Sequence, residues 1–102
     1  MFESKVRNEA TDVLVKALLL LESEEECYRF LEDICTYKEI QDLAQRLHVA
    51  GMLRNKATYT DIVQLTGMST ATISRVNRAM IYGSGGYEAV LEKLESRGSI
   101  IE

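Results

Sequence analysis

At 102 residues, with 46% apolar side chains and no proline, the chain is long enough for one small helical domain. Its 12 basic and 16 acidic residues give a net charge of −4, without the overall basic charge of non-specific nucleic-acid binders. No signal peptide is evident, and the apolar run Leu18–Leu21 is too short to span a bilayer, so we expect a cytoplasmic protein. Cys27 and Cys35 lack a second pair or a histidine at metal-ligand spacing. We interpret them as small buried apolar residues in a reducing compartment and expect no metal or cofactor.

The first expected helix covers residues 4–21, where apolar residues recur at helical spacing. Over residues 14–21 the only polar side chain is that of Lys16, so this helix is apolar nearly all round. Such a helix has to be covered on both sides, which a chain of six short helices cannot do alone. We therefore expect a homodimer, with a monomeric bundle that covers its own central helix as the alternative.

Two further helices are predicted before the middle of the chain. Ser23 and Glu26 form a capping box that opens the second helix. Thr36 and Glu39 repeat the box and open a third helix that ends near Arg54. This third helix carries an apolar stripe at helical spacing, which predicts that it packs on a core: Ile40, Leu43, Leu47, Ala50 and Leu53.

Residues 58–80 predict two helices joined by a glycine turn. A cap at Thr58 opens the first helix, Gly67 ends it in a left-handed turn, and Ser69 caps the second. Three apolar residues are expected on the buried side of the first helix: Ile62, Val63 and Leu65. This spacing is typical of a helix-turn-helix, whose second helix enters the major groove of DNA. An ordinary antiparallel helical hairpin is the alternative.

The second helix of this unit has the residue order expected of a recognition helix. Small polar residues lead, so that the first turn can approach base edges, and arginines follow where phosphates or guanine edges lie. The expected DNA-binding residues lie on this unit and at the end of the preceding helix: Arg54, Lys56, Thr58, Ser69, Thr70, Ala71, Ser74, Arg75 and Arg78.

The charges of the chain are segregated along the sequence. Residues 44–82 hold five basic residues and one acidic residue, a net charge of +4, whereas residues 1–43 carry −6 and residues 83–102 carry −2. Charge runs are usually solvated faces, but a basic segment on an acidic body attracts phosphate locally and favours one docking orientation. Double-stranded DNA is therefore the expected partner.

The glycines of residues 83–86 predict a turn, and a final helix is expected from Tyr87 to about Arg97. The whole chain, residues 1–102, is then expected to form a single all-α domain of six helices. Its expected parts are the dimerisation helices in residues 1–57, the helix-turn-helix in residues 58–80, and the C-terminal turn and helix in residues 81–102.

From Thr36 to Met80 the chain resembles the tryptophan repressor superfamily. Overall it is similar to the tryptophan-repressor-like, or repressor-related, proteins of Gram-positive bacteria. The resemblance is carried by Thr36, by Leu43 to Arg46, and by the run from Gly67 to Arg75, in which Ala71-Thr72-Ile73-Ser74-Arg75 is the closest stretch. It implies an interlocked, all-helical homodimer that regulates transcription, with helix-turn-helix units projecting from its sides.

The resemblance also implies an effector pocket between the third helix and the recognition helix. By motif position it assigns Thr36, Arg46 and Arg75 to this pocket. Val76 stands where the tryptophan repressor has a glycine, and a branched side chain there should fill the space of an indole. We therefore expect that a small-molecule effector, where one exists, is not tryptophan.

Two other classes of function stay open. A helical interaction module could reuse the fold to bind a protein, but its recognition helix should then be apolar, whereas Ser69, Thr70 and Ser74 are polar. A small all-helical enzyme would need cationic and carboxylate groups that converge on one cavity, and no catalytic residues stand at such spacing. We expect a sequence-specific DNA-binding regulator of transcription, and not an enzyme.

Overall fold

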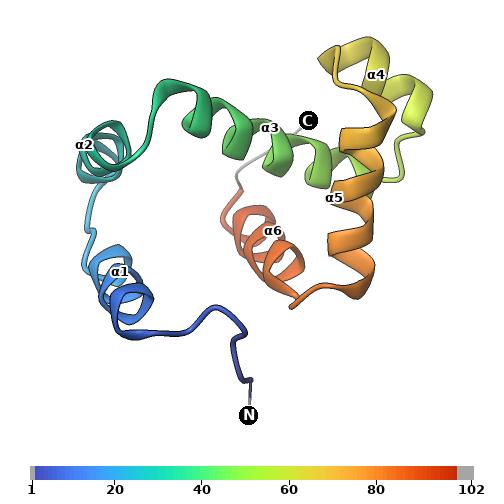
Figure 1. Cartoon of the computed structure of the whole chain (residues 1–102). Coiled ribbons are helices and arrows are strands. Elements are labelled where there is room, and N and C mark those ends of the chain that lie inside the picture. Colours follow the sequence, from blue (N-terminus) through green and yellow to red (C-terminus); the bar gives the residue numbers. More distant parts are fainter. Residues whose placement is uncertain (1, 99–102) are drawn as a thin grey trace. The chain divides into compact units, whose positions relative to one another are not determined.

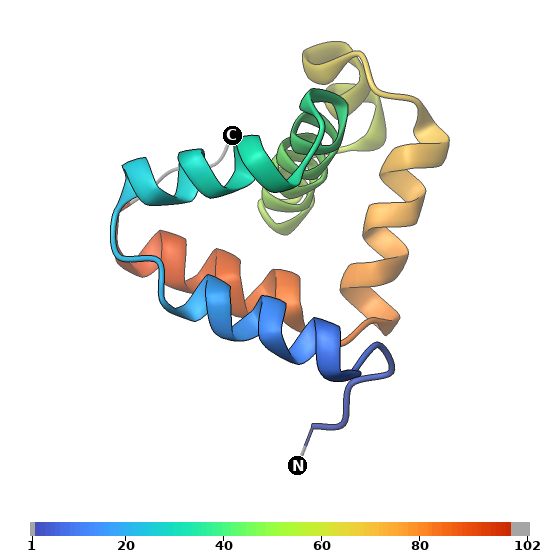
Figure 2. The ribbon, with the colours of Figure 1, turned by 60° about the vertical axis from the view of Figure 1, so that its left-hand side comes forward.

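The computed structural model describes residues 2–98, which contain six helices and no strand (Figures 1 and 2). The helices are α1 (Glu9–Leu19), α2 (Glu24–Ile34), α3 (Tyr37–Arg54), α4 (Tyr59–Thr66), α5 (Thr70–Tyr82) and α6 (Gly86–Ser96). The predicted all-α architecture of six helices is therefore confirmed. The chain divides into two compact units, residues 1–37 with α1 and α2, and residues 38–102 with α3 to α6. In the described part of the chain no helix is long and apolar enough to cross a membrane.

Helix α1 begins at Glu9, five residues later than the sequence predicts. Asn8 is its cap, because the Asn8 side chain accepts the N–H of Thr11 at 2.9 Å. The Thr11 hydroxyl in turn accepts the N–H of Asn8 at 2.7 Å, which completes a capping box that was not predicted from the sequence. Apolar periodicity continues beyond the helix, but helix ends are set by the hydrogen bonds that satisfy terminal N–H groups.

Helix α2 begins after Ser23, as predicted. Ser23 Oγ accepts the N–H of Glu26 at 3.1 Å. In a standard capping box the Glu26 carboxylate would accept the N–H of Ser23. Here it accepts the N–H of Glu22, one residue before the cap, at 2.8 Å. The cysteines of this segment, Cys27 and Cys35, are free thiols and are half-buried rather than buried.

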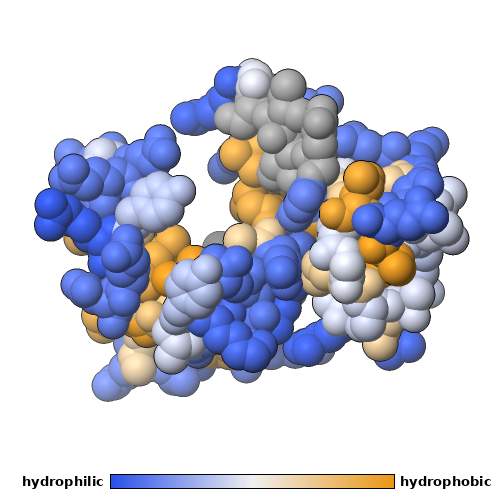
Figure 3. All heavy atoms as spheres, turned by 90° about the horizontal axis from the view of Figure 1, so that it is seen from above, coloured by the Kyte–Doolittle hydropathy of each residue, from blue (hydrophilic) through white to orange (hydrophobic). Residues whose placement is uncertain are grey.

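The N-terminal unit leaves its apolar side chains open to solvent. Neither α1 nor α2 contains a buried residue. On α1, Leu19 is 80% exposed and Val13 is 64% exposed. Apolar atoms, orange in Figure 3, reach the surface of this unit beside polar ones. Exposed apolar area on this scale is typical of a surface that another protein covers.

The C-terminal unit has a closed apolar core. The second half of α3 packs there with α4, α5 and α6 (Figure 2). Each of these four helices contributes at least one side chain that is no more than 5% exposed: Val49, Ala50, Met52, Ile62, Ile73, Val76 and Leu91. The core fixes α4 and α5 on α3 without help from the N-terminal unit.

The inward face of α4 differs from the predicted one. Ile62 is fully buried and Val63 is half-buried, as expected, but Leu65 is 75% exposed. Thr66 takes the inward position instead, where its hydroxyl donates to the carbonyl of Ile62 at 2.6 Å. A threonine that satisfies its hydroxyl within its own helix can face the core, so hydropathy alone assigned the wrong residue.

Candidate nucleic-acid interface and ligand cavity

Local hydrogen bonds define α4 and the turn that follows it. Thr58 Oγ1 accepts the N–H of Asp61 at 3.1 Å, and the Asp61 carboxylate accepts the N–H of Thr58 at 3.4 Å. Gly67 has a φ of 72°, in the left-handed region, and its N–H donates to the carbonyl of Val63 at 2.8 Å. The cap and the glycine turn predicted from the sequence are therefore both present.

Helix α5 is fixed at its cap and along its buried face. Ser69 Oγ accepts the N–H of Thr72 at 3.2 Å, while Ile73 and Val76 lie in the core. This arrangement decides which side of α5 faces solvent. The residues expected to bind DNA around this helix are all exposed: Ser69, Thr70, Ala71, Ser74, Arg75 and Arg78. Small side chains thus stand at the exposed N-terminus of α5, and two guanidinium groups follow within its next two turns.

Arg54, at the end of α3, is engaged by two carboxylates of α6. Its Nε donates to the two carboxylate oxygens of Glu88 at 3.1 and 3.2 Å, and a second nitrogen donates to Glu95. The Arg54 side chain is 26% exposed, and the hydrogen bonds to Glu88 and Glu95 raise its pKa above the ordinary value. The guanidinium charge is thus compensated within the unit, and a contact between Arg54 and DNA stays a prediction.

Lys56 and Thr58 lie at the entry to α4. Lys56 is exposed and has a φ of 66°; it is the one residue other than glycine with a positive φ in residues 2–98. Its N–H donates to the carbonyl of Leu53 at 2.9 Å, and the N–H of Ala57 donates to that of Met52 at 3.0 Å. This pair of bonds is a Schellman motif, in which the left-handed position usually holds glycine.

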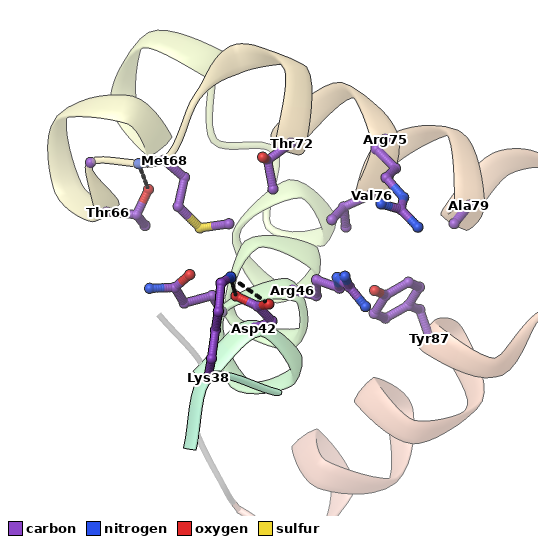
Figure 4. Close-up of a pocket in the computed structure, with 12 residues that line it drawn as sticks. Lys38, Asp42, Arg46, Thr66, Met68, Thr72, Arg75, Val76, Ala79 and Tyr87 are labelled. Carbon is purple, nitrogen blue, oxygen red and sulfur yellow. Dashed lines mark hydrogen bonds and ion pairs between the residues drawn. The ribbon is translucent and has the colours of Figure 1, made fainter. Parts of the chain in front are cut away.

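A cavity of about 580 Å³ lies between α3, α5 and the first turn of α6 (Figure 4). The lining residues of each of the two main helices follow one another at steps of three or four positions, apart from the neighbours Gln45/Arg46 and Arg75/Val76, so each helix presents one face. The lining residues are Lys38, Asp42, Gln45, Arg46, Thr66, Gly67, Met68, Thr72, Arg75, Val76, Ala79 and Tyr87. In residues 2–98, no group of three or more His, Cys, Asp or Glu residues could hold a metal ion.

The structure brings together three of the four residues predicted for an effector pocket. Arg46, Arg75 and Val76 all line the cavity. Thr36 belongs to the N-terminal unit, and its assignment to the pocket stays a prediction. The other lining residues of α3 and α5 were missed, although their helical spacing from Arg46 and Arg75 was a usable signal. Tyr87 had no such signal, because it reaches the cavity only through the fold of the glycine turn before α6.

The chain belongs to the Trp repressor protein family, whose model matches residues 9–95. The resemblance read from the sequence is thereby confirmed. The chain is 52% identical over 91 residues to YerC of Bacillus subtilis, a protein described as uncharacterized, and the match covers 89% of this chain and 88% of YerC.

Two solved structures have a similar fold. A TrpR-like protein from Eubacterium eligens is 50% identical, with a TM-score of 0.85, over 89% of this chain and 94% of its own. A candidate Trp repressor from Staphylococcus aureus is 47% identical, with a TM-score of 0.84, over 96% of this chain and 93% of its own.

Proposed function

We propose that the chain is a sequence-specific DNA-binding regulator of transcription that acts in the cytoplasm as a homodimer. The helix-turn-helix of this proposal consists of α4, the Gly67 turn and α5. The observation that carries it is the face of α5 opposite Ile73 and Val76, which is polar, cationic and exposed. Membership in a family named for a repressor supports the same function.

The exposed residues of α5 divide into two roles in this proposal. Thr70 and Ala71 stand in the first turn, where small side chains can approach base edges in the major groove. Arg78, two turns later, and Lys56, before α4, are placed to contact phosphates, which fix orientation without reading sequence. Arg75 is exposed and also lines the cavity, so it belongs to both the interface and the pocket.

The homodimer is supported by the apolar surface of the N-terminal unit. A segment of 37 residues without one buried side chain in its helices has no core of its own and needs a covering surface. A second copy of the chain supplies such a surface, and two recognition helices related by a two-fold axis read two half-sites about one DNA turn apart. The interlocked arrangement implied by the resemblance is part of this proposal.

The cavity beside α5 is proposed to bind a small-molecule effector other than tryptophan. Val76, 2% exposed, forms part of both the core and the cavity wall, so an indole would have to displace a packed side chain. An effector between α3 and α5 would contact Arg46 of α3 and Arg75 of the recognition helix, where it can bias the angle of that helix.

The DNA-binding proposal is tested by selecting fragments of the source genome bound by the purified dimer, with and without cell metabolites. Affinity is then measured against salt concentration for the selected fragment and for a scrambled one. Ala71→Leu should change the preference at one base pair per half-site by about 1–3 kcal/mol. Arg78→Ala should weaken binding to both fragments equally and lower the salt slope by about two per dimer.

Lys93→Ala is the matched control, because it removes one exposed positive charge from α6, outside the proposed interface. It should leave the sequence preference and the salt slope unchanged. A dimer with no preference and no salt dependence on any genomic fragment would contradict the proposal. A helical protein-interaction module that reuses the same fold would then be the better interpretation.

A further inference from the structure

Tyr87 is an aromatic wall of the cavity that comes from outside the two helices expected to form it. It lies in the first turn of α6, is half-buried, and packs against the core. Figure 4 shows its phenol ring pointing from α6 toward Arg46, with Arg75 reaching down from α5 into the same end of the cavity. Three hydrogen-bond donors from three helices therefore converge on one end of this space.

The charges around the cavity favour a ligand with more than one negative charge. Lys38 is neutralised by Asp42, with Nζ to carboxylate distances of 3.0 and 3.4 Å. Within residues 2–98, neither Arg46 nor Arg75 forms an ion pair with any carboxylate. The lining thus carries two uncompensated positive charges on a chain whose net charge is −4. Two guanidinium groups that line one cavity can both contact an anion that lies between them.

The ion pairs of Arg54 link the helix that carries Tyr87 to the end of α3. Glu88, the next residue along α6, accepts two hydrogen bonds from Arg54 of α3, and Glu95, seven residues further on, accepts another. Leu91 is buried between these two carboxylates on the same face of α6. The helix is thus held against the end of α3 by one buried leucine flanked by two charged contacts, and its first turn is presented to the cavity.

The connection from α5 gives α6 little support of its own. Gly85 precedes α6 with a φ of 82°, and no side chain caps that helix. Gly83 has no room for a side chain, since a Cβ atom there would lie 2.2 Å from the carbonyl oxygen of Ala79. The placement of Tyr87 therefore depends on the packing of α6 against α5 and on the ion pairs between α6 and Arg54 of α3.

We propose that Tyr87 is a specificity-determining residue of this cavity. Its hydroxyl donates a hydrogen bond to a compact dianionic group that Arg46 and Arg75 hold. The ligand class is a small metabolite with a phosphate or a dicarboxylate group, and Arg54 acts as the positioning residue through α6. This inference rests on the proposed effector pocket, but it concerns binding in the absence of DNA. It can therefore fail while the DNA-binding proposal stands, and the reverse also holds.

The test is calorimetric titration of the full-length protein, without DNA, using inorganic phosphate, malonate and acetate at mildly alkaline pH. Phosphate or malonate should bind the unmodified protein at least about tenfold more tightly than acetate, because the single charge of acetate cannot satisfy both guanidinium groups. Tyr87→Phe removes only the hydroxyl and should weaken dianion binding about tenfold without changing the unfolding temperature. Tyr82→Phe is the matched control, since Tyr82 is 81% exposed and should have no effect.

The positioning role of Arg54 is tested by the same titration. Arg54→Gln should weaken dianion binding, and exchanging the charges in the triple variant Arg54→Glu, Glu88→Lys, Glu95→Lys should restore it. A merely stabilising contact would change the unfolding temperature and leave the affinity of the folded protein unchanged. Absence of saturable binding of phosphate and malonate would overturn the ligand class. Equal binding by Tyr87→Phe and the unmodified protein would overturn the role of Tyr87.

Discussion

Lys56→Gly is expected to stabilise the protein while weakening its binding to DNA. Lys56 occupies the left-handed position at the end of α3, with a φ of 66°. For a residue with a Cβ atom this conformation costs roughly 1–2 kcal/mol, which glycine avoids. Glycine also gains freedom in the unfolded chain, which offsets roughly 0.5–1 kcal/mol of that relief. The net gain should be about 0.5–1 kcal/mol, or a rise of about 2–6 °C in unfolding temperature.

The assay combines thermal unfolding at fixed protein concentration with the salt dependence of DNA binding. Lys56→Gln keeps the Cβ atom and removes the charge, so its stability should match the unmodified protein while its DNA affinity falls like that of Lys56→Gly. Asn55→Gly is the backbone control, because Asn55 has no positive φ and the change should destabilise. If Lys56→Gly unfolds at or below the temperature of Lys56→Gln, the strain argument is wrong.

Three further substitutions test the dimer, the cavity and the core. Leu18→Glu should give unfolded or aggregated chain, because it places a charge in the proposed dimer interface. Lys16→Glu is the control and should leave the protein folded. A folded monomer of the unmodified protein in sedimentation would contradict the dimer. Val76→Gly should bind tryptophan measurably in calorimetry where the unmodified protein does not, and tight binding by the latter would show that Val76 leaves room for an indole. Leu91→Ala should lower the free energy of unfolding by about 2–4 kcal/mol in denaturant titrations, since Leu91 is only 4% exposed; a change under about 1 kcal/mol would place α6 outside the folded core.

The parts of the fold that were predictable from the sequence are those encoded by short-range chemistry. The cap at Thr58, the left-handed Gly67 and the cap at Ser69 each depend on residues within four positions, and all three are present. The start of α1 was misplaced, because the apolar pattern runs beyond the box formed by Asn8 and Thr11. Hydropathy describes which face is apolar, but it does not say where the terminal N–H groups find partners.

Long-range partners were the part that the sequence could not provide. Arg54 was predicted to bind DNA, because no partner for a basic residue just before the predicted helix-turn-helix is visible in the sequence. Its carboxylates are Glu88 and Glu95, more than thirty residues away on α6. Tyr87 was missed for the same reason, since its approach to Arg46 depends on how α6 returns to α3 after the glycine turn. Such contacts depend on how the helices pack and produce no periodic pattern in the sequence.

The double role of Val76 constrains how this protein can change over evolution. The same side chain fills the core beside Ile73 and closes one wall of the cavity. A substitution that reshapes this wall therefore also removes or adds core volume, and most such variants lose stability before they acquire a new ligand. Two other lining residues are less tightly coupled to the core, because Ala79 of α5 is exposed and Tyr87 of α6 is only half-buried. Lineages that adapt the cavity to different molecules should therefore diverge at positions 79 and 87 while keeping a branched apolar residue at position 76.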